Sequence, residues 1–454
     1  IYNYENNQEI VKQTYEGLKK QQHRGRDSYG FLFYNIMNPI LVKNTGKIQE
    51  PDFKISNINK TLGHTKYTTS EYRTEIKSDK DMLNVTQPFR GMNTRLGEFY
   101  LVHNGNIRDL DLVKANFDLQ DTDILNDSHL LVKIIESLEL QRWEDIINQI
   151  MLSIEGSFSV ILLTRQNMYC FKDLRAYRPL CIGNNISGYC IASETVGLGE
   201  YKYIKEVERG EILKIGQEGM EKMEIFVDLS KINEKKCLFE YIYFLNAESV
   251  FLNGEKQKIS VRQYRYQFGI ELGKNEKYKN LSKEAIVIGA PMTGIPSGMG
   301  FADILKYQYS QILVKNKNSG RSFILKTDEE RINECKKKFI IENGELMYNK
   351  EVFFVDDSLV RGNTLKVIIE LLRKYKPKKI HIRITCPKVL NICEYGIDIP
   401  SREELIMNWN TDEEFIKKIG ADSINFLNIN DMFNIMGNKN YCVNCFESNK
   451  EIEW

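Results

Sequence analysis

Two adjacent carboxylates, Asp356 and Asp357, directly follow the apolar run VFFV at residues 352–355. Such a run is typical of a parallel strand buried on both faces. A polar turn with a glycine comes next, and a helix-like pattern begins at residue 364. A turn of this kind directs backbone N–H groups at a phosphate, and the acids suit ribose hydroxyls or a magnesium ion on pyrophosphate. The pattern predicts a sugar-phosphate site, although an ordinary loop capped by Asp or Ser would also fit a bare DDS turn.

Four cysteines in three separated segments form a second candidate site. Cys442 and Cys445 make a CxxC near the end of the chain, and Cys237 and Cys393 lie far from them in sequence. Four thiolates can hold a zinc ion or a [4Fe-4S] cluster, and a bare CxxC does not separate these alternatives. The remaining five cysteines are expected to be ordinary thiols.

The first half of the chain carries short polar segments that are each weak alone. Asn104 and Gly105, in HNGN, taken on their own are typical of a plain turn between two strands. The segments, in order, are QQHRGRDSYGF, LGHTKYTTS, TQPF, YLVHNGNI, IEGSFSVILL, LRAYRPLCIG and IASET.

Composition limits the class of protein. The 454 residues are enough for two or three domains, and the 63 basic and 62 acidic residues nearly cancel. This balance argues against a general nucleic-acid-binding surface. We find no apolar run long enough to span a membrane and no secretory signal, so we expect no membrane partner. Nine cysteines are too few for a disulfide scaffold, which favours a reducing, cytoplasmic setting.

The elements that must position these residues differ between the two halves. Strand-like and helical segments in residues 1–232 predict an α+β layer structure with mainly antiparallel pairing. The helices are expected at 8–25, 127–139 and 142–155, and the strands at 31–35, 61–69, 99–105, 158–164, 167–173, 179–183 and 189–193.

In residues 233–454 apolar strands alternate with helices, which predicts a parallel sheet wrapped by helices. The strands are expected at 283–291, 310–316, 350–358 and 378–386, and the helices at 298–309, 364–375 and 412–421. We expect the domain boundary near residues 230–240, where KINEKKC is polar and charged.

Two family resemblances give these motifs roles. VFFVDDSLVRGNTL resembles the signature of type I phosphoribosyltransferases, and the N-terminal series resembles class II glutamine amidotransferases, whose domains have αββα layers. The second resemblance implies that Asn104 and Gly105 form the oxyanion hole, that Asp127 holds the glutamine amino group, and that Lys66 holds its carboxylate. The family usually has Arg where Lys66 stands, so the charge is kept and the two-pronged geometry is lost.

The nucleophile in that family is an N-terminal cysteine whose own amino group acts as base. IYNYE would follow its strand directly, so we expect the cysteine about five residues ahead of Ile1. The other interpretation is an inactive glutaminase half.

Nearly the whole chain resembles glutamine phosphoribosylpyrophosphate (PRPP) amidotransferases, of the Bacillus and animal type. CLFEYIYF, VRQYRYQFGIELG and YGIDIPSREELI add to the resemblance. It implies PRPP and glutamine as substrates, phosphoribosylamine as product in the first step of purine synthesis, purine nucleotides as inhibitors, and a homodimer or homotetramer. It also implies a structural [4Fe-4S] cluster on the four cysteines and Mg²⁺ at Thr293, Asp356 and Asp357. The residues expected to bind PRPP are Asp356, Asp357, Ser358, Val360, Arg361, Gly362, Asn363 and Thr364.

A flap is expected at residues 315–338, where Lys336, Lys337 and Lys338 could reach pyrophosphate; a solvated charge run is the alternative. Met292 stands where the family has an acid, and YFLNAES and KNKNSGR also depart from its pattern. These departures, with Lys66, leave two further hypotheses. One is a divergent paralogue that uses PRPP with ammonia or another nucleophile, and the other is a non-catalytic PRPP or nucleotide sensor.

Overall fold

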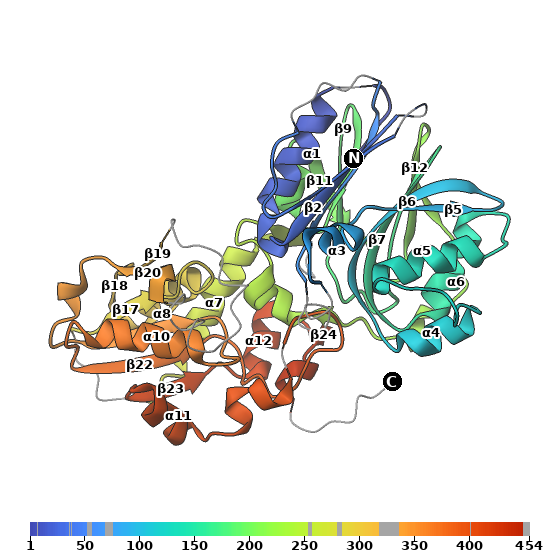
Figure 1. The fold of residues 1–454 in the computed structure, drawn as a ribbon. Helices are drawn as coiled ribbons and strands as arrows, with labels where there is room; N and C mark the ends of the chain where they lie inside the picture. Colours follow the sequence, from blue (N-terminus) through green and yellow to red (C-terminus); the bar gives the residue numbers. More distant parts are fainter. Residues whose placement is uncertain are drawn as a thin grey trace.

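The computed structural model describes residues 1–454 except 7, 36, 38, 52–56, 69–75, 253–256, 279–283, 317–335, 400 and 448–454. The first half contains two stacked sheets with helices on their outer faces (Figure 1). The seven-stranded sheet has the order β11 (Lys202–Glu206), β9 (Cys181–Asn185), β10 (Gly188–Ala192), β1 (Tyr2–Asn3), β4 (Lys60–Lys66), β2 (Ser28–Tyr34), β3 (Ile40–Thr45). The six-stranded sheet has the order β13 (Gly219–Met223), β12 (Ile212–Gly216), β8 (Met168–Lys172), β7 (Gly156–Thr164), β6 (Gly97–Ile107), β5 (Phe89–Asn93).

Separate apolar cores hold these layers together. Between the sheets, side chains such as Leu32, Val102 and Ile182 are buried. Helix α1 (Glu9–Lys20) covers the first sheet through Ile10, Tyr15 and neighbours. Helices α5 (Asp127–Ser137) and α6 (Trp143–Ser153) cover the second sheet, and α3 (Asp79–Asn84) and α4 (Leu110–Asn116) are short. All pairings within the two sheets are antiparallel, which confirms the predicted αββα layers.

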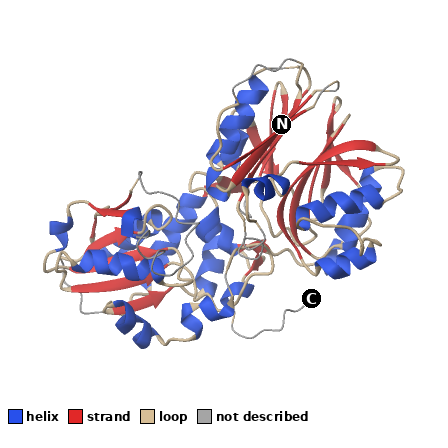
Figure 2. Ribbon diagram, viewed as in Figure 1, coloured by secondary structure: helices blue, strands red, loops and turns tan. Residues whose placement is uncertain are grey.

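The second half is built on a parallel sheet, seen beside the helices in Figure 2. Its order is β18 (Gln308–Tyr309), β17 (Ile286–Gly289), β21 (Glu351–Asp356), β22 (Lys379–Ile384), β23 (Ser423–Phe426). Every pairing in it is parallel, as the alternating pattern predicts. The helices are α7 (Val261–Lys274), α8 (Ile295–Leu305), α10 (Asn363–Arg373), α11 (Asp412–Ile419) and α12 (Ile429–Met436).

One predicted strand lies elsewhere. The segment at 310–316 was expected in the parallel sheet, but β19 (Leu313–Lys315) pairs antiparallel with β20 (Phe339–Ile341) in a separate ribbon. The sheet edge is instead formed by β18, only two residues long, which the apolar pattern did not single out. A short edge strand has too few residues for a periodic signal, so this prediction was wrong for a physical reason.

Two small elements join the halves. The strand β14 (Lys236–Cys237) pairs in parallel with β24 (Tyr441–Cys442), and a short π-helix, η4 (Glu240–Phe244), follows β14. The buried guanidinium of Arg265 fixes this helix by donating to the carbonyl oxygens of Tyr241 at 2.9 Å and Leu245 at 2.7 Å. Among the described residues, we find no helix with the length and apolar character needed to cross a membrane.

Candidate functional site

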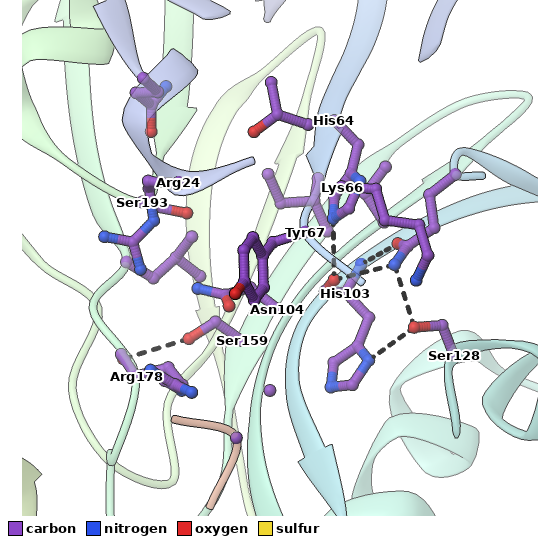
Figure 3. Close-up of a pocket in the computed structure, with 18 of the residues that line it drawn as sticks. Arg24, His64, Lys66, Tyr67, His103, Asn104, Ser128, Ser159, Arg178 and Ser193 are labelled. Carbon is purple, nitrogen blue, oxygen red and sulfur yellow. Dashed lines mark hydrogen bonds between the residues drawn. The ribbon is translucent and has the colours of Figure 1, made fainter. Parts of the chain in front are cut away.

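A cavity of about 200 Å³ opens between the two sheets of the first half, and the C-terminal half contributes to its wall. Figure 3 shows Lys66, Tyr67, Asn104 and Arg178 around the same space. All four residues predicted for the glutamine site line it. The lining includes Arg24, His64, Lys66, Tyr67, Gln87, His103, Asn104, Gly105, Asp127, Ser128, Ser159, Arg178, Phe244, Gly396 and Asp398.

Asn104 and Gly105 lie on β6, where the sheet register sets them opposite Ser159 and Phe158 of β7. The Asn104 side-chain nitrogen is buried and has no hydrogen-bond partner among the described residues. A buried donor without a partner is costly, and a substrate oxygen would satisfy it. At Gly105 a Cβ would lie 1.8 Å from the Ser157 carbonyl oxygen, so only glycine fits. The pair thus has the donor and the close backbone approach of an oxyanion hole.

Lys66 and Asp127 approach the cavity from different elements. Asp127 opens α5, whose N-terminal Asn126 caps it by accepting from the His129 backbone at 2.8 Å. Lys66 ends β4, and burial lowers the pKa of its ammonium, while Asp127 and Asp27 oppose that shift. A cation and a carboxylate on one cavity match the two charged ends of an α-amino acid.

In the cavity wall, His103 and Gln87 form a hydrogen-bond network that the sequence did not predict. His103 shares a hydrogen bond of 2.9 Å between Nδ1 and Ser128 Oγ, and its backbone N–H donates to Gln87 Oε1 at 2.6 Å. Gln87 Nε2 donates in turn to Ser128 Oγ at 2.9 Å. Burial lowers the pKa of His64, the neighbour of this network, to about 3, so its ring is neutral at pH 7. The network connects His103, the residue directly before Asn104, to Ser128 in the first turn of α5, so it holds these two segments in a fixed relation.

A buried ion network was also missed. Arg24 donates to Glu194 at 2.9 Å and to Glu240 at 2.8 Å, and Arg178 donates to the same Glu240 oxygen at 2.8 Å. His23 contacts Glu194 at 2.7 Å. Burial favours the neutral carboxyl of Glu194, but His23 and Arg24 outweigh burial and lower its pKa to about 2. No local sequence signal marks this network, because Arg24 lies in a polar segment and its two carboxylate partners are 170 and 216 residues away.

At the end of β21, local hydrogen bonds fix the turn that carries Asp356 and Asp357. Thr293 donates to Asp357 Oδ2, Ser358 donates to Asp357 Oδ1 at 2.5 Å, and the Asp357 N–H donates to Asp356 Oδ1 at 2.8 Å. Burial raises the pKa of both acids, and the charge of Asp357 raises that of Asp356 further. A cation or hydroxyl donors would stabilise the negative charge of two carboxylates held this close together.

The rest of the predicted phosphate loop connects this turn to α10. Gly362 precedes the helix with φ of +77°, which favours glycine. The helix begins at Asn363, so the N–H groups of its first turn, including that of Thr364, lie at the end of the loop. Arg361 pairs with Glu404 at 2.7 Å, and Val360 is half-buried.

Most of the expected flap, residues 317–335, lies outside the described residues. Of its lysines, Lys336 pairs with Glu370 on α10 at 3.4 Å, and both side chains are about half exposed. The backbone of Lys337 and Lys338 accepts hydrogen bonds from Asn316.

The four predicted cysteines line one small cavity between the halves. The pairing of β14 with β24 sets Cys237 opposite Cys442, and Cys445 follows on the next turn. Burial raises the pKa of Cys442 to about 12 and raises that of the other three thiols. Among the described residues no three His, Cys, Asp or Glu side chains converge closely enough to hold one metal ion. The thiols surround a space instead of meeting at a point.

With this geometry in view, comparisons with known proteins agree across the chain. The family model for the phosphoribosyl transferase domain matches residues 267–403. An amidophosphoribosyltransferase of Synechococcus elongatus is 30% identical over 468 residues, 98% of this chain and 89% of that protein. The one from Bacillus subtilis is 30% identical over 449 residues, 96% and 89% of the two chains. The one from Methanocaldococcus jannaschii is 28% identical over 98% of this chain and 95% of its own.

Among solved structures, the glutamine PRPP amidotransferase from B. subtilis, complexed with ADP and GMP, matches with a TM-score of 0.82. The sequences are 27% identical there, and the match covers 98% of this chain and 95% of that one. Fold, cavity residues and relatives therefore point to one conclusion. This chain belongs to the amidophosphoribosyltransferase family.

Proposed function

We propose that this protein converts PRPP, glutamine and water into 5-phosphoribosylamine, glutamate and pyrophosphate, the first step of purine synthesis. The observation that carries the proposal is that one short element, η4, borders both candidate sites. Its Phe244 lines the amide cavity. The pKa of the adjacent Tyr243 is raised to about 12, first by burial and then by the charges of Asp357, Tyr67 and Asp356. Tyr243 therefore lies near the acid pair of the sugar-phosphate site. Ammonia released in the cavity would pass along η4 to reach the sugar.

In this proposal the first half hydrolyses glutamine. Lys66 binds the substrate carboxylate, Asp127 binds its amino group, and Asn104 Nδ2 with the Gly105 N–H stabilises the oxyanion. The nucleophile is a cysteine ahead of Ile1. Because β1 runs antiparallel to β4, with Tyr2 opposite Lys60, preceding residues would continue along β4 past His64 to Lys66, at the cavity. Intact-mass measurement of the natural N-terminus tests this, and any residue other than cysteine at the mature start would refute it.

The second half binds PRPP. Asp356 and Asp357 would meet the ribose hydroxyls, and the loop to α10, from Ser358 to Thr364, would hold the 5-phosphate with its backbone N–H groups. Magnesium fits beside Thr293 and the acid pair, because Mg²⁺ is commonly held by one or two carboxylates together with substrate phosphates. When bound, it would stabilise negative charge on the leaving pyrophosphate.

The four cysteines, we propose, hold a [4Fe-4S] cluster that ties the C-terminal segment to the junction. Support comes from four thiols around one cavity, since a single zinc ion needs ligands that converge to about 2.3 Å from the metal. We propose a structural role for this cluster, because Cys237 and Cys442 lie on the paired strands that join the C-terminal segment to the junction. Iron and acid-labile sulfide analysis of protein purified without oxygen tests it. Zinc alone, or no metal, would refute it.

Purine nucleotides are proposed as inhibitors because the B. subtilis relative is described with ADP and GMP. A homodimer or homotetramer is proposed on the family resemblance alone, and light scattering in solution tests it.

The deciding experiment compares nitrogen donors. Protein with its natural N-terminus is assayed with PRPP and Mg²⁺, using glutamine or an ammonium salt, and pyrophosphate is measured. Glutamine-dependent release supports the proposal. Release with ammonium but not with glutamine supports the hypothesis of a divergent paralogue. PRPP binding without any pyrophosphate release supports the hypothesis of a sensor.

A further inference from the structure

A turn of the C-terminal half is fixed to the end of the oxyanion strand β6. The Asn106 side-chain nitrogen donates to the carbonyl oxygen of Glu394 at 2.9 Å. The backbone N–H of Asn106 donates to Ser157 Oγ at 3.2 Å, and this hydroxyl donates to the carbonyl oxygen of Tyr395 at 2.8 Å. Two side chains of the first half therefore hold two successive carbonyl groups of the second, directly beside Gly105.

The packing around this contact leaves little freedom. Gly396, the next residue of the turn, has φ of +86°, and a Cβ there would lie 3.0 Å from the Gly105 carbonyl oxygen and 2.7 Å from Arg178 Nη2. The ring of Tyr395 stacks on Tyr177 with centroids 4.1 Å apart. Arg178 is itself held by Glu240, at 2.8 Å. The turn is thus held by Tyr177 as well as by Asn106 and Ser157, and Gly396 packs closely against the carbonyl group of Gly105.

We propose that Asn106 and Ser157 are positioning residues for glutamine hydrolysis, because they seat Gly105 of the oxyanion hole on the turn at residues 394–396. The inference rests on the proposed function. Glycine has more backbone freedom than any other residue, so its N–H needs external support to keep one direction. The next peptide group supplies that support through the Asn106 N–H and Ser157 Oγ. Within the described part of the chain, the hydrogen bonds of Asn106 and Ser157 do not go to Lys66 or Asp127, the residues proposed to hold the substrate ends.

This separation gives a kinetic signature. Loss of an interaction that acts only in the transition state lowers kcat and leaves ground-state binding unchanged. We expect Ser157→Ala and Asn106→Ala each to lower the glutamine-dependent kcat about five- to tenfold, the cost of one hydrogen bond. The double variant should approach the roughly 100-fold effect of losing an oxyanion donor. The KM for glutamine and the ammonia-dependent rate should stay within about twofold of the wild type.

The experiment uses the full chain with its natural N-terminus and measures both rates and the KM for glutamine. Asn106→Asp keeps the side-chain size but removes the donor, so it serves as a second variant if Asn106→Ala does not fold. Asn148→Ala is the matched control. Asn148 is a buried side chain that donates to the carbonyl oxygens of Glu144 at 3.0 Å and Glu224 at 3.1 Å, away from the cavity. It should lower stability without changing the ratio of the two rates.

An unchanged glutamine-dependent kcat in the Ser157 and Asn106 variants would overturn the inference, and so would an equal loss of glutamine- and ammonia-dependent rates. A wild-type enzyme that never hydrolyses glutamine would overturn the proposed function, and this inference with it.

Discussion

Replacing Glu240 by glutamine tests the ion network at the junction of the two halves. The Glu240 side chain is 2% exposed and accepts from Arg24 Nη1 at 3.0 Å, Arg24 Nη2 at 2.8 Å and Arg178 Nη1 at 2.8 Å. The glutamine side chain of this variant keeps one acceptor oxygen but removes the charge. Of its two carboxylate partners, Arg24 then retains Glu194, at 2.9 Å. Breaking a buried ion pair by removing one partner costs about 3–5 kcal/mol. At about 2–4 °C for each kcal/mol, the melting temperature should fall by roughly 6–20 °C.

Low pH should also lower the stability of the wild-type protein. Burial raises the pKa of Glu240, but Arg24 and Arg178 outweigh it and the net pKa is lowered. A carboxyl with a lowered folded-state pKa stabilises the protein above its unfolded value of about 4.3, and this stability is lost as pH falls through the folded value. Because the pKa of Glu194 is lowered to about 2, the free energy of unfolding should fall between about pH 4 and pH 2. This fall should be less steep in Glu240→Gln.

Urea and thermal unfolding of the two proteins measure these effects. Glu98→Gln is the control, since the Arg90–Glu98 pair has the same chemistry at 2.6 Å with 64% and 24% of the side chains exposed. An exposed pair contributes about 0–1 kcal/mol. If Glu240→Gln lowers stability no more than Glu98→Gln, the reasoning about the buried network is refuted.

Three further substitutions act at the two sites. Asn104→Ala should lower the glutamine-dependent kcat by about 10²–10³-fold and spare the ammonia-dependent rate, because the oxyanion loses a donor; equal losses in steady-state assays would contradict this. Lys66→Arg should lower the KM for glutamine about fivefold by adding a second N–H donor to the carboxylate, about 1 kcal/mol; an unchanged KM would count against Lys66 as the carboxylate clamp. Asp357→Asn should weaken PRPP binding in calorimetry at least about tenfold. It should also stabilise the free protein at neutral pH, because burial raises the folded-state pKa of Asp357, and burial and the charge of Asp357 raise that of Asp356, so ionisation is unfavourable there; tighter PRPP binding would contradict the assignment.

The regular elements were predictable from sequence because their apolar periods are long. The VFFV strand, β21, and the apolar face of α10 show this clearly, and both lie as predicted. The edge strand β18 was not predictable, because two residues carry no period.

The residues of the candidate sites also differ in how far the sequence predicts them. Residues within compact motifs, such as Asn104 with Gly105 and Asp356 with Asp357, could be found from neighbouring letters. Arg24, Glu194 and Glu240 could not, because their network joins segments 170 and 216 residues apart and only the fold reveals that they meet. The contact between Asn106 and Glu394 spans 288 residues and was hidden for the same reason.

The proposed function requires that one chain couples an amide site to a sugar-phosphate site. Glutamine hydrolysis by the protein with its natural N-terminus tests this coupling, measured as glutamate formed with and without PRPP and Mg²⁺. We expect PRPP to stimulate hydrolysis strongly and glutamate and pyrophosphate to appear in equal amounts. Glutamate formation that is indifferent to PRPP, or absent while PRPP is bound, would contradict it.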